Sequence, residues 1–593
     1  MIKPFRTAHS RRHAQRRTQR RPWHNIGGQK TFDISRLPHE NLKVVPLGGL
    51  EEVGRNMTFF EYGDDILIID MGLQFPEEGM PGIDYIIPNI SYLKEHRDRI
   101  RGVIITHAHL DHIGAIPYLI HELGNPTIYA GALTRGIILR RQEDFKHLPP
   151  VDIEVIDIDR KIRFGDAFEA EFFHVNHNIF DTFGVAVHTP VGTVCHTADF
   201  KFDNNPVGDK PADYAKMARL SSEGVLLLMS DSTGAERPGH SISEKTIQEN
   251  LEDIFQHSQG RIITATFGTL ISRIQQLITL AEKFDRKVAI DGYSMKANVA
   301  IAQELGYIKA QKGTFVDIDK IGNYTPERQL ICGTGAQGES NAVLMRIAQK
   351  EHRFIQLEKG DTVVFSSSVV PGNERTVQSL KDLIYRQGAK VFHYQMMDIH
   401  SGGHAQEEDL KMMINLMRPK FFMPIHGNYF LLKLHAGLAE SVGIPEENIV
   451  IPNNGQIAEI SPDKITLLKK LIPASYVMVD GLGVGDVGEV VLRDRQVLSQ
   501  DGIFVIITII DSKTGKIVGS PDIISRGFIY LRENQEMLKQ VRHKIRETIE
   551  NTATAEQTLD VDYIKNNLRD KIGQFLFSKT ERRPMVLPVV IKV

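Results

Sequence analysis

The chain has 593 residues, of which 41% are hydrophobic and 24% charged, so it is too long for one hydrophobic core and predicts roughly two to four globular units. Two cysteines, Cys195 and Cys332, exclude an extensive disulfide framework and a cysteine zinc cluster, and no apolar run reaches the ~20 residues of a membrane span, so we predict a cytoplasmic protein without a membrane partner. The net charge of -3 neither favours nor excludes a nucleic-acid partner.

Residues 1–38 form a polar tail that carries many basic side chains and almost no acidic ones. Runs of like charge repel one another and seldom pack into a core, so we predict that this tail is disordered. We expect folded sequence from about residue 39 onward.

Short apolar runs recur beyond the tail, and each ends in polar residues. The runs cover residues 66–69, 103–105, 191–195, 225–229 and 421–425. Runs of this length bounded by polar residues predict buried strands. The residues that follow them include Asp70, His107, Asp199, Asp231 and His426. Because α/β proteins place their sites just past strand ends, we expect these side chains near a site.

Between residues 241 and 395 the pattern changes to a regular alternation. Strand-like stretches are 261–266, 287–290, 329–332 and 361–365, and helix-like stretches are 270–284, 295–305, 341–349 and 373–385. This βαβ alternation predicts a parallel sheet. Site-type residues resume at His400, so we interpret 241–395 as a domain inserted into a core formed by 39–240 and 396–462.

The rest of the chain is predicted to be a linker, 463–485, and a C-terminal domain, 486–593. In that domain, strand-like stretches are 503–510 and 585–593, and amphipathic helices are 533–552 and 563–577. Strands and helices that follow one another without βαβ alternation predict an α+β domain.

The strongest chemical signal is the segment His107-Ala108-His109-Leu110-Asp111-His112. Imidazole and carboxylate are the ligands that zinc prefers where no thiolate is offered. Alternate residues of a loop share one side, so His107 and His109 can reach one metal ion while Asp111 and His112 turn toward a second. A polar loop with chance histidines is the alternative, but four ligand-type residues within six positions argue against it.

One loop cannot complete two metal shells, so further ligands must come from elsewhere in the chain. His177 lies between asparagines, and Asp199 and His426 each follow a predicted strand. Each of the three is weak evidence alone and gains strength from the 107–112 segment. We expect Asp199 to bridge both metal ions.

These residues resemble the metallo-β-lactamase superfamily, whose HxHxDH motif is matched in full, with Asp70, His177 and Asp199 at its other motif positions. The inserted domain, together with Asp231, His404 and His426, resembles the β-CASP nucleases. From about residue 40 to 593 the chain resembles the bacterial ribonuclease J family. The segments that carry this resemblance are 48–54, 82–85, 199–203, 230–233, 525–528 and 579–585.

The resemblance implies an α/β protein: a metallo-β-lactamase αββα sandwich with an inserted β-CASP parallel-sheet domain and a C-terminal α+β domain. It implies a zinc-dependent ribonuclease with 5′-to-3′ exonuclease and endonuclease activity on single-stranded RNA, acting in rRNA maturation and mRNA processing or decay. It also implies a homodimer or homotetramer, and other RNA-decay proteins as partners. With such a substrate, the basic tail is either a solvated extension or an arm that contacts RNA.

The resemblance implies two Zn²⁺ ions per subunit and a hydroxide between them that attacks phosphorus. One zinc would be held by His107, His109 and His177, and the other by Asp111, His112 and His426, with Asp199 as the bridge.

Three further residues receive roles from the same resemblance. His404 would contact the scissile phosphate or protonate the leaving oxygen. Asp231 would orient His404, and Asp70 would support the ligand loop from behind. The alternative for His404 is an ordinary loop histidine.

The segment His400-Ser401-Gly402-Gly403-His404 matches the family's pocket for the 5′-phosphate of RNA. Gly402 stands where the family usually has serine, so the preference for monophosphate ends is open, although backbone N–H groups can still hold a phosphate. Other departures from the family pattern are Ala198 for glycine, Phe180 for proline and Asn428 for glutamate.

The resemblance also implies a structural Ca²⁺ near Gly82, Asp84 and Asp480; the alternative is an ordinary surface pair of acids. A second motif, GxGxxG from Gly333 to Gly338, suggests a dinucleotide site. The next predicted strand ends in serines, with no acid to bind a ribose, so a rim that contacts the RNA backbone is the better interpretation.

Three alternatives to a ribonuclease stay open. They are a DNA-processing nuclease of the β-CASP type, a hydrolase of small molecules on the same zinc core, and a catalytically silent RNA-binding subunit. The inserted domain argues against a small substrate because it adds a second wall to a channel. A silent subunit would have lost metal ligands, and the motif here is complete.

Overall fold

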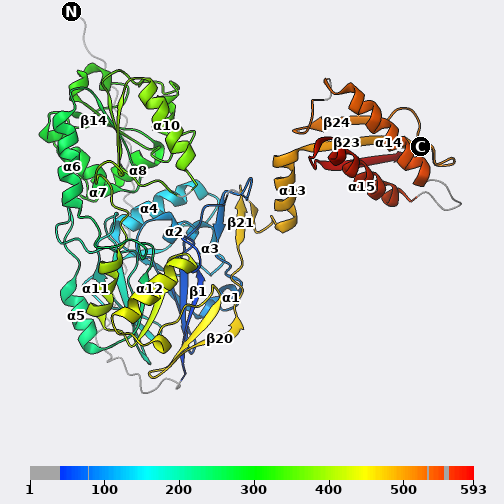
Figure 1. Ribbon diagram of the computed structural model, residues 1–593. Helices are drawn as coiled ribbons and strands as arrows, with labels where there is room; N and C mark the ends of the chain where they lie inside the picture. The colour runs from blue at the N-terminus through cyan, green and yellow to red at the C-terminus, as the bar shows by residue number, and fades with distance from the viewer. Residues whose placement is uncertain (1–39, 78, 371, 482, 531–532, 553–559) are drawn as a thin grey trace, which may run out of the picture. The chain divides into compact units, whose positions relative to one another are not determined.

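The computed structural model describes residues 40–593 apart from 78, 371, 482, 531–532 and 553–559 (Figure 1). The basic tail predicted for residues 1–38 lies outside these described residues. Within them, each helix is either too short or too polar to cross a lipid bilayer.

Two sheets of the core account for the buried strands. The first has the order β20 (Ile465–Leu471), β19 (Gln456–Ile460), β1 (Leu42–Gly48), β2 (Met57–Tyr62), β3 (Asp65–Ile69), β5 (Ile100–Ile104), β6 (Ile128–Ala130) and β7 (Ile153–Val155). The second has the order β18 (Phe421–Ile425), β12 (Val225–Asp231), β11 (Gly192–His196), β10 (Phe183–Thr189), β9 (Phe168–His174) and β8 (Ile162–Phe164).

Two strands of each sheet are buried along their whole length. Every residue of β2, β3, β12 and β18 is buried, so both faces of these strands are covered. A strand covered on both faces reads as a continuous apolar run rather than an alternating one, which is the pattern seen in the sequence. The five runs predicted as strands all coincide with strands of the structure.

Helices supply the outer layers of the core. The helices are α1 (Ser91–Glu95), α2 (Leu110–Ile113), α3 (Ile116–Leu119), α4 (Ala132–Gln142), α5 (Tyr214–Glu223), α11 (Glu407–Met417) and α12 (Tyr429–Ser441). Buried residues of α2, α3 and α4 share a hydrophobic cluster with the first sheet. Those of α5, α11 and α12 share another with the second sheet. The predicted αββα sandwich is thereby confirmed.

The segment 463–485 is not the plain linker that we predicted. Its first part is β20, an edge strand that pairs with β19 across a short turn. Its second part contains β21 (Val477–Asp480) and β22 (Gly483–Val484), which form a small sheet with β4 (Tyr85–Ile87) of the core. The backbone of this segment finds its hydrogen-bond partners in strands of the core, and the sequence signal was weak because β20 is largely exposed.

The inserted region contains one parallel sheet, shown in green in Figure 1. Its order is β14 (Lys287–Ile290), β15 (Gln329–Gly333), β13 (Ile262–Ala265), β16 (Thr362–Phe365) and β17 (Lys390–His393), and every pair is parallel, as predicted. The accompanying helices are α6 (Glu244–His257), α7 (Ile271–Lys283), α8 (Tyr293–Glu304), α9 (Val343–Ala348) and α10 (Glu374–Arg386). The strand β17 was missed because only one of its four residues is fully buried.

The last part of the chain is an α+β unit, as predicted. It contains α13 (Glu489–Asp501), β23 (Ile503–Ile510), β24 (Asp522–Arg526), α14 (Gln535–Thr552), α15 (Val561–Thr580) and β25 (Met585–Lys592). The sheet order is β24-β23-β25, and α14 and α15 pack on one face of it.

A buried charge network joins the insert to the core. Arg273 of α7 donates to Glu244 at 2.9 Å and to the backbone oxygen of Ile399 at 2.6 Å. Lys201 of the core donates to the other oxygen of Glu244 at 3.1 Å. Burial raises the pKa of Glu244, but the charges of Arg273 and Lys201 outweigh it and lower that pKa to about 2. The network therefore holds a carboxylate between two cations.

We expect Arg273→Met to destabilise the protein by about 3–5 kcal/mol, because it leaves the buried carboxylate of Glu244 with one partner fewer. Urea unfolding followed by circular dichroism measures the loss. Arg375→Met, at an exposed position of α10, is the control and should change the stability by less than ~0.5 kcal/mol. Equal midpoints for the two variants would contradict the assigned role.

Candidate metal centre

The HxHxDH segment follows β5 directly and divides into a loop and a helix. His107 and His109 lie in the loop, whereas Asp111 and His112 lie in the short helix α2. We predicted that a loop alone places the two pairs on different sides. The structure does so by starting a helix at Leu110, which turns the second pair away from the first.

Three ring nitrogens converge on one point. Nδ1 of His109 lies 3.0 Å from Nε2 of His107 and 3.1 Å from Nε2 of His177. Oδ2 of Asp199 lies 3.6 Å from the His107 nitrogen and 3.9 Å from the His177 nitrogen. Tetrahedral zinc with bonds of ~2.0–2.1 Å spaces its ligand atoms roughly 3.3 Å apart. These four atoms can therefore hold one metal ion.

A second group of ligand atoms shares the same carboxylate oxygen. Oδ2 of Asp199 lies 3.3 Å from Nε2 of His112. Oδ2 of Asp111 lies 3.5 Å from that nitrogen and 3.3 Å from Nε2 of His426. These residues form a second set that can hold a metal ion. All seven predicted ligands thus lie in two adjoining groups that meet at Asp199.

The protonation of the first group suits a cation. Burial lowers the pKa of His107 and His177 well below the usual value and that of His109 to about 4, so these rings are neutral and present lone pairs. In the second group Nε2 of His426 is buried without a hydrogen-bond partner. Converging lone pairs repel one another unless a positive charge lies between them. The donor set therefore fits a metal ion.

Asp70 contacts the second group from the side away from the site. Its carboxylate accepts from the backbone N–H of Thr106 and from Nδ1 of His112, both at 2.8 Å. This contact fixes the His112 ring with Nε2 toward the site. The sequence reasoning missed Asn56, whose Nδ2 lies 3.2 Å from the same Nε2. No ligand motif contains it.

Ala198, beside Asp199, is one of the departures from the family pattern, which has glycine there. Its φ is 58°, in the left-handed region that glycine adopts with least strain. The backbone keeps this conformation, and Asp199 still reaches both groups.

His404 and Asp231 form a pair next to the ligand groups. Nδ1 of His404 lies 2.8 Å from Oδ2 of Asp231, which is buried at the end of β12. The rings of His404 and His177 have centroids 5.2 Å apart. The third set of residues that can approach a single ion consists of Asp199, Asp231, His404 and His426. The structure therefore places the predicted catalytic pair beside the predicted ligands.

The segment from His400 to His404 borders the same site. The backbone oxygen of Gly403 lies 2.7 Å from Nδ1 of His177, so it orients that ring. Gly403 has a φ of 83°, and a Cβ there would meet the His177 ring at 2.8 Å. Only glycine fits this position without strain. Nδ1 of His400 is buried and has no hydrogen-bond partner.

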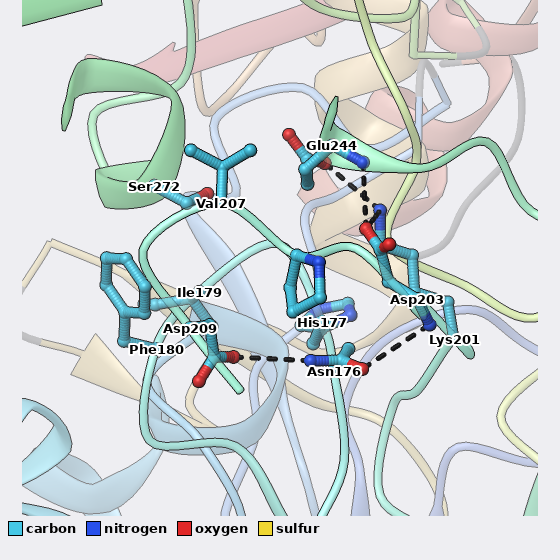
Figure 2. Close-up of a pocket in the computed structure, with 11 residues that line it drawn as sticks. Asn176, His177, Ile179, Phe180, Lys201, Asp203, Val207, Asp209, Glu244 and Ser272 are labelled. Carbon is cyan, nitrogen blue, oxygen red and sulfur yellow. Dashed lines mark hydrogen bonds and ion pairs between the residues drawn. The ribbon is translucent and has the colours of Figure 1, made fainter. Parts of the chain in front are cut away.

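The residues beneath this segment were not predicted. Lys201 donates to Ser401 at 3.4 Å and thereby joins the segment to the Glu244 network. A small pocket between this network and His177 is lined by residues of the core and the insert (Figure 2). The signal for Lys201 was present, because it lies in the 199–203 segment that carries the family resemblance.

The predicted calcium site does not fit a calcium ion. The structure brings Asp84 and Asp480 to the paired strands β4 and β21. The guanidinium of Arg495 pairs with Asp480 and donates to the oxygen of Gly82 at 3.1 Å. Asp84 accepts from the N–H of Gly481 at 2.8 Å. The guanidinium of Arg495 thus already supplies to Asp480 and to the oxygen of Gly82 the positive charge that a calcium ion would bring.

The chain matches four protein-family models. Family models match the metallo-β-lactamase superfamily over residues 50–253, the ribonuclease J β-CASP domain over 259–384, the Zn-dependent metallo-hydrolase RNA specificity domain over 393–452, and the ribonuclease J C-terminal domain over 490–593. A protein of unknown function from Enterococcus faecalis shares the fold, with a TM-score of 0.51 and 15% identity over 71% of this chain and 100% of that one.

Two curated relatives match almost the whole chain. Ribonuclease J 1 of Streptococcus pyogenes is 41% identical over 94% of this chain and 99% of its own length. Ribonuclease J2 of Bacillus subtilis is 37% identical over 93% of this chain and 99% of its own length. With this identity over nearly the full length, and with matches to two ribonuclease J domain models, the chain belongs to the ribonuclease J family.

Proposed function

We propose that the chain is a metal-dependent ribonuclease that holds two zinc ions and hydrolyses phosphodiester bonds of single-stranded RNA. The relatives named ribonuclease J and the match to an RNA specificity domain support the substrate. One observation carries the catalytic part: a single oxygen of Asp199 lies within 3.9 Å of ring nitrogens from both ligand groups. A carboxylate placed in this way is able to bridge a pair of metal ions.

Zinc fits the donor set because both groups offer imidazole and carboxylate without thiolate. When bound, zinc lowers the pKa of a water molecule toward neutrality and neutralises charge on the phosphoryl oxygens. His107, His109 and His177 would hold one ion and Asp111, His112 and His426 the other, and Asp199 belongs to both sets of residues that could hold an ion.

We assign His404 and Asp231 to the leaving group. The carboxylate of Asp231 accepts a hydrogen bond from Nδ1 of His404, so the His404 ring is held in one orientation. His404 then has Nε2 for the scissile phosphate or for the leaving oxygen, which it protonates. Asp231 acts through His404 and does not itself contact the substrate.

We propose that the His400–Gly403 segment binds the 5′-phosphate of RNA and so favours 5′-to-3′ exonuclease action. Three cations act on His400: burial and the charge of Arg273 lower its pKa to about 3, against the opposing charge of Glu244, and Lys201 and Arg237 lower it further. A Cβ on Gly402 would lie 3.5 Å from the guanidinium of Arg237. An arginine thus lies where the family's usual serine would point.

We also propose that the chain forms homodimers or homotetramers through the C-terminal sheet. One face of this sheet packs on α14 and α15. The other presents apolar side chains to solvent, among them Ile509, Ile524, Val589, and, nearly half exposed, Leu587 at 47% and Ile591 at 46%. An open apolar face of this kind marks a protein interface. A second copy of the chain offers the same apolar face.

The proposed cellular location and roles of the activity come from the sequence. Cys195 and Cys332 are both buried and free, which supports a reducing cytoplasm. Roles in rRNA maturation and mRNA processing or decay, an endonuclease activity and contacts with other RNA-decay proteins stay predictions from the resemblance.

Asp111→Asn and His112→Ala should each lower RNA cleavage by at least ~100-fold, because each removes a donor from the second ligand group. Cleavage of a labelled RNA, with zinc content measured on the same samples, tests this. His257→Ala, at an exposed position of α6, is the matched histidine control. Full activity in the Asp111 and His112 variants would leave only a binding role for the chain.

The 5′ end of the substrate should control the rate. We expect one RNA with a 5′-monophosphate to be degraded faster than the same RNA with a triphosphate or a hydroxyl, and Gly402→Ser to change this preference more than the rate on hydroxyl ends. Product sizing separates single nucleotides from internal fragments. A DNA strand of the same sequence is the control for the 2′-OH. Equal cleavage of DNA would favour a DNA-processing nuclease.

Ile591→Glu should convert the oligomer to smaller species, because it places a charge in the apolar face opposite Ile509 of β23. Sedimentation or light scattering after size exclusion measures the mass. Tyr563→Glu, exposed on α15 on the other side of the sheet, should leave the mass unchanged. A wild-type chain that is monomeric at micromolar concentration would refute the interface.

A further inference from the structure

The loop that carries His177 differs from those that carry the other predicted ligands. It joins β9 to β10, and it contacts helices of the insert as well as the core. The 107–112 segment, Asp199 and His426 instead follow strands β5, β11 and β18 of the core sheets. His177 is therefore the ligand whose surroundings depend directly on the inserted domain.

Tyr307, just beyond α8 of the insert, makes two contacts with this loop. Its ring stacks on Phe180, with centroids 5.4 Å apart and an interplanar angle of 21°. Its hydroxyl donates to the carboxylate of Asp181. The other oxygen of Asp181 accepts from the backbone N–H of Leu133 at 2.8 Å, at the start of α4. Asp181 thereby joins the insert, the loop and a core helix.

The loop needs such support because its backbone is unusual. Asp181 has a φ of 62°, a conformation that costs free energy for a residue other than glycine. Burial and the charge of Asp181 raise the pKa of Tyr307, so the phenol keeps its proton and remains a donor. Phe180, next to Asp181, supplies the flat ring on which Tyr307 stacks.

The insert makes a second contact with the loop that carries His177. Ser272 of α7 donates to the backbone oxygen of Asn178 at 3.2 Å. The side chain of Asn178 donates in turn to the oxygen of Gly402 at 3.2 Å. In Figure 2, Phe180 and Ser272 lie on the same side of the pocket, with His177 between them and Lys201.

We propose that Tyr307 is a positioning residue for the metal ligand His177, so that the inserted domain helps to assemble the first ligand group. The proposal rests on the two-metal site proposed above. Packing of the insert on the loop holds Nε2 of His177 against Nδ1 of His109, at the observed 3.1 Å. The second group, with Asp111, His112 and His426, has no ligand on this loop. Loss of Tyr307 should therefore weaken one metal position and spare the other.

Zinc titration of the metal-free full-length chain against a chromophoric chelator tests the proposal. Wild type should take up two equivalents. In Tyr307→Ala one equivalent should bind about 10–100-fold more weakly while the other is unchanged, since removal of an outer partner of a metal ligand has effects of this size. Tyr307→Phe keeps the stack on Phe180 and loses the hydroxyl donor, so its affinity for the weakened zinc equivalent should lie between those of wild type and Tyr307→Ala.

Tyr385→Ala is the matched control, because Tyr385 is an exposed tyrosine on α10 of the same insert. Thermal unfolding of each metal-free variant reports whether it folds, and Tyr307→Phe decides the matter if Tyr307→Ala does not. Two unchanged equivalents in the Tyr307 variants, or an equal loss from both positions, would overturn the role of Tyr307.

The outcomes also separate this inference from the proposed function. A wild-type chain that takes up two zinc equivalents but fails to cleave RNA would refute the ribonuclease and leave the role of Tyr307 standing. A wild-type chain that takes up fewer than two equivalents would contradict both.

Discussion

The structure depends on imidazole nitrogens and a carboxylate oxygen that lie close together in a largely buried site. Nε2 of His107 and Nε2 of His177 each lie within 3.1 Å of Nδ1 of His109, and one oxygen of Asp199 lies within 3.9 Å of ring nitrogens from both groups. Without a positive charge between them, the neutral rings of the first group face one another with lone pairs that repel, and the fold would lose free energy by holding them together. Metal binding and folding are therefore linked, because the ion stabilises the arrangement that holds it.

Sheet register brings the distant ligands to this point. Strand β12 pairs in parallel with β18, and Asp231 lies opposite Ile425. The residue after Ile425 is His426, so the same pairing that continues the second sheet delivers a ligand from beyond the insert. It also sets Asp231 beside the segment that carries His404. Ordinary hydrogen bonding between strands thus connects the two halves of the core at the site.

Much of this could be predicted because the signals are local. Buried strands read as apolar runs, the insert shows a βαβ rhythm, and His107 to His112 form a compact motif. The role of 463–485 could not be predicted, since β20 is an exposed edge strand with little pattern. Nor could the calcium site be judged, because Arg495 reaches Gly82 from far along the chain. Contacts such as that of Tyr307 with Asp181 arise from tertiary packing between distant segments, and no local sequence pattern predicts them.

The first sheet has a consequence for synthesis on the ribosome. One side of strand β1 pairs with β19, where Val44 lies opposite Ala458. The backbone groups on that edge of β1 therefore stay unpaired until a strand more than 400 residues later in the chain has been synthesised. Residues 107, 109, 177 and 199 all emerge before the insert, whereas His426 emerges after it. A growing chain therefore gains one full set of donors early and the other late. All donors of the set that includes His177 are thus synthesised before Tyr307, which contacts the loop that carries His177.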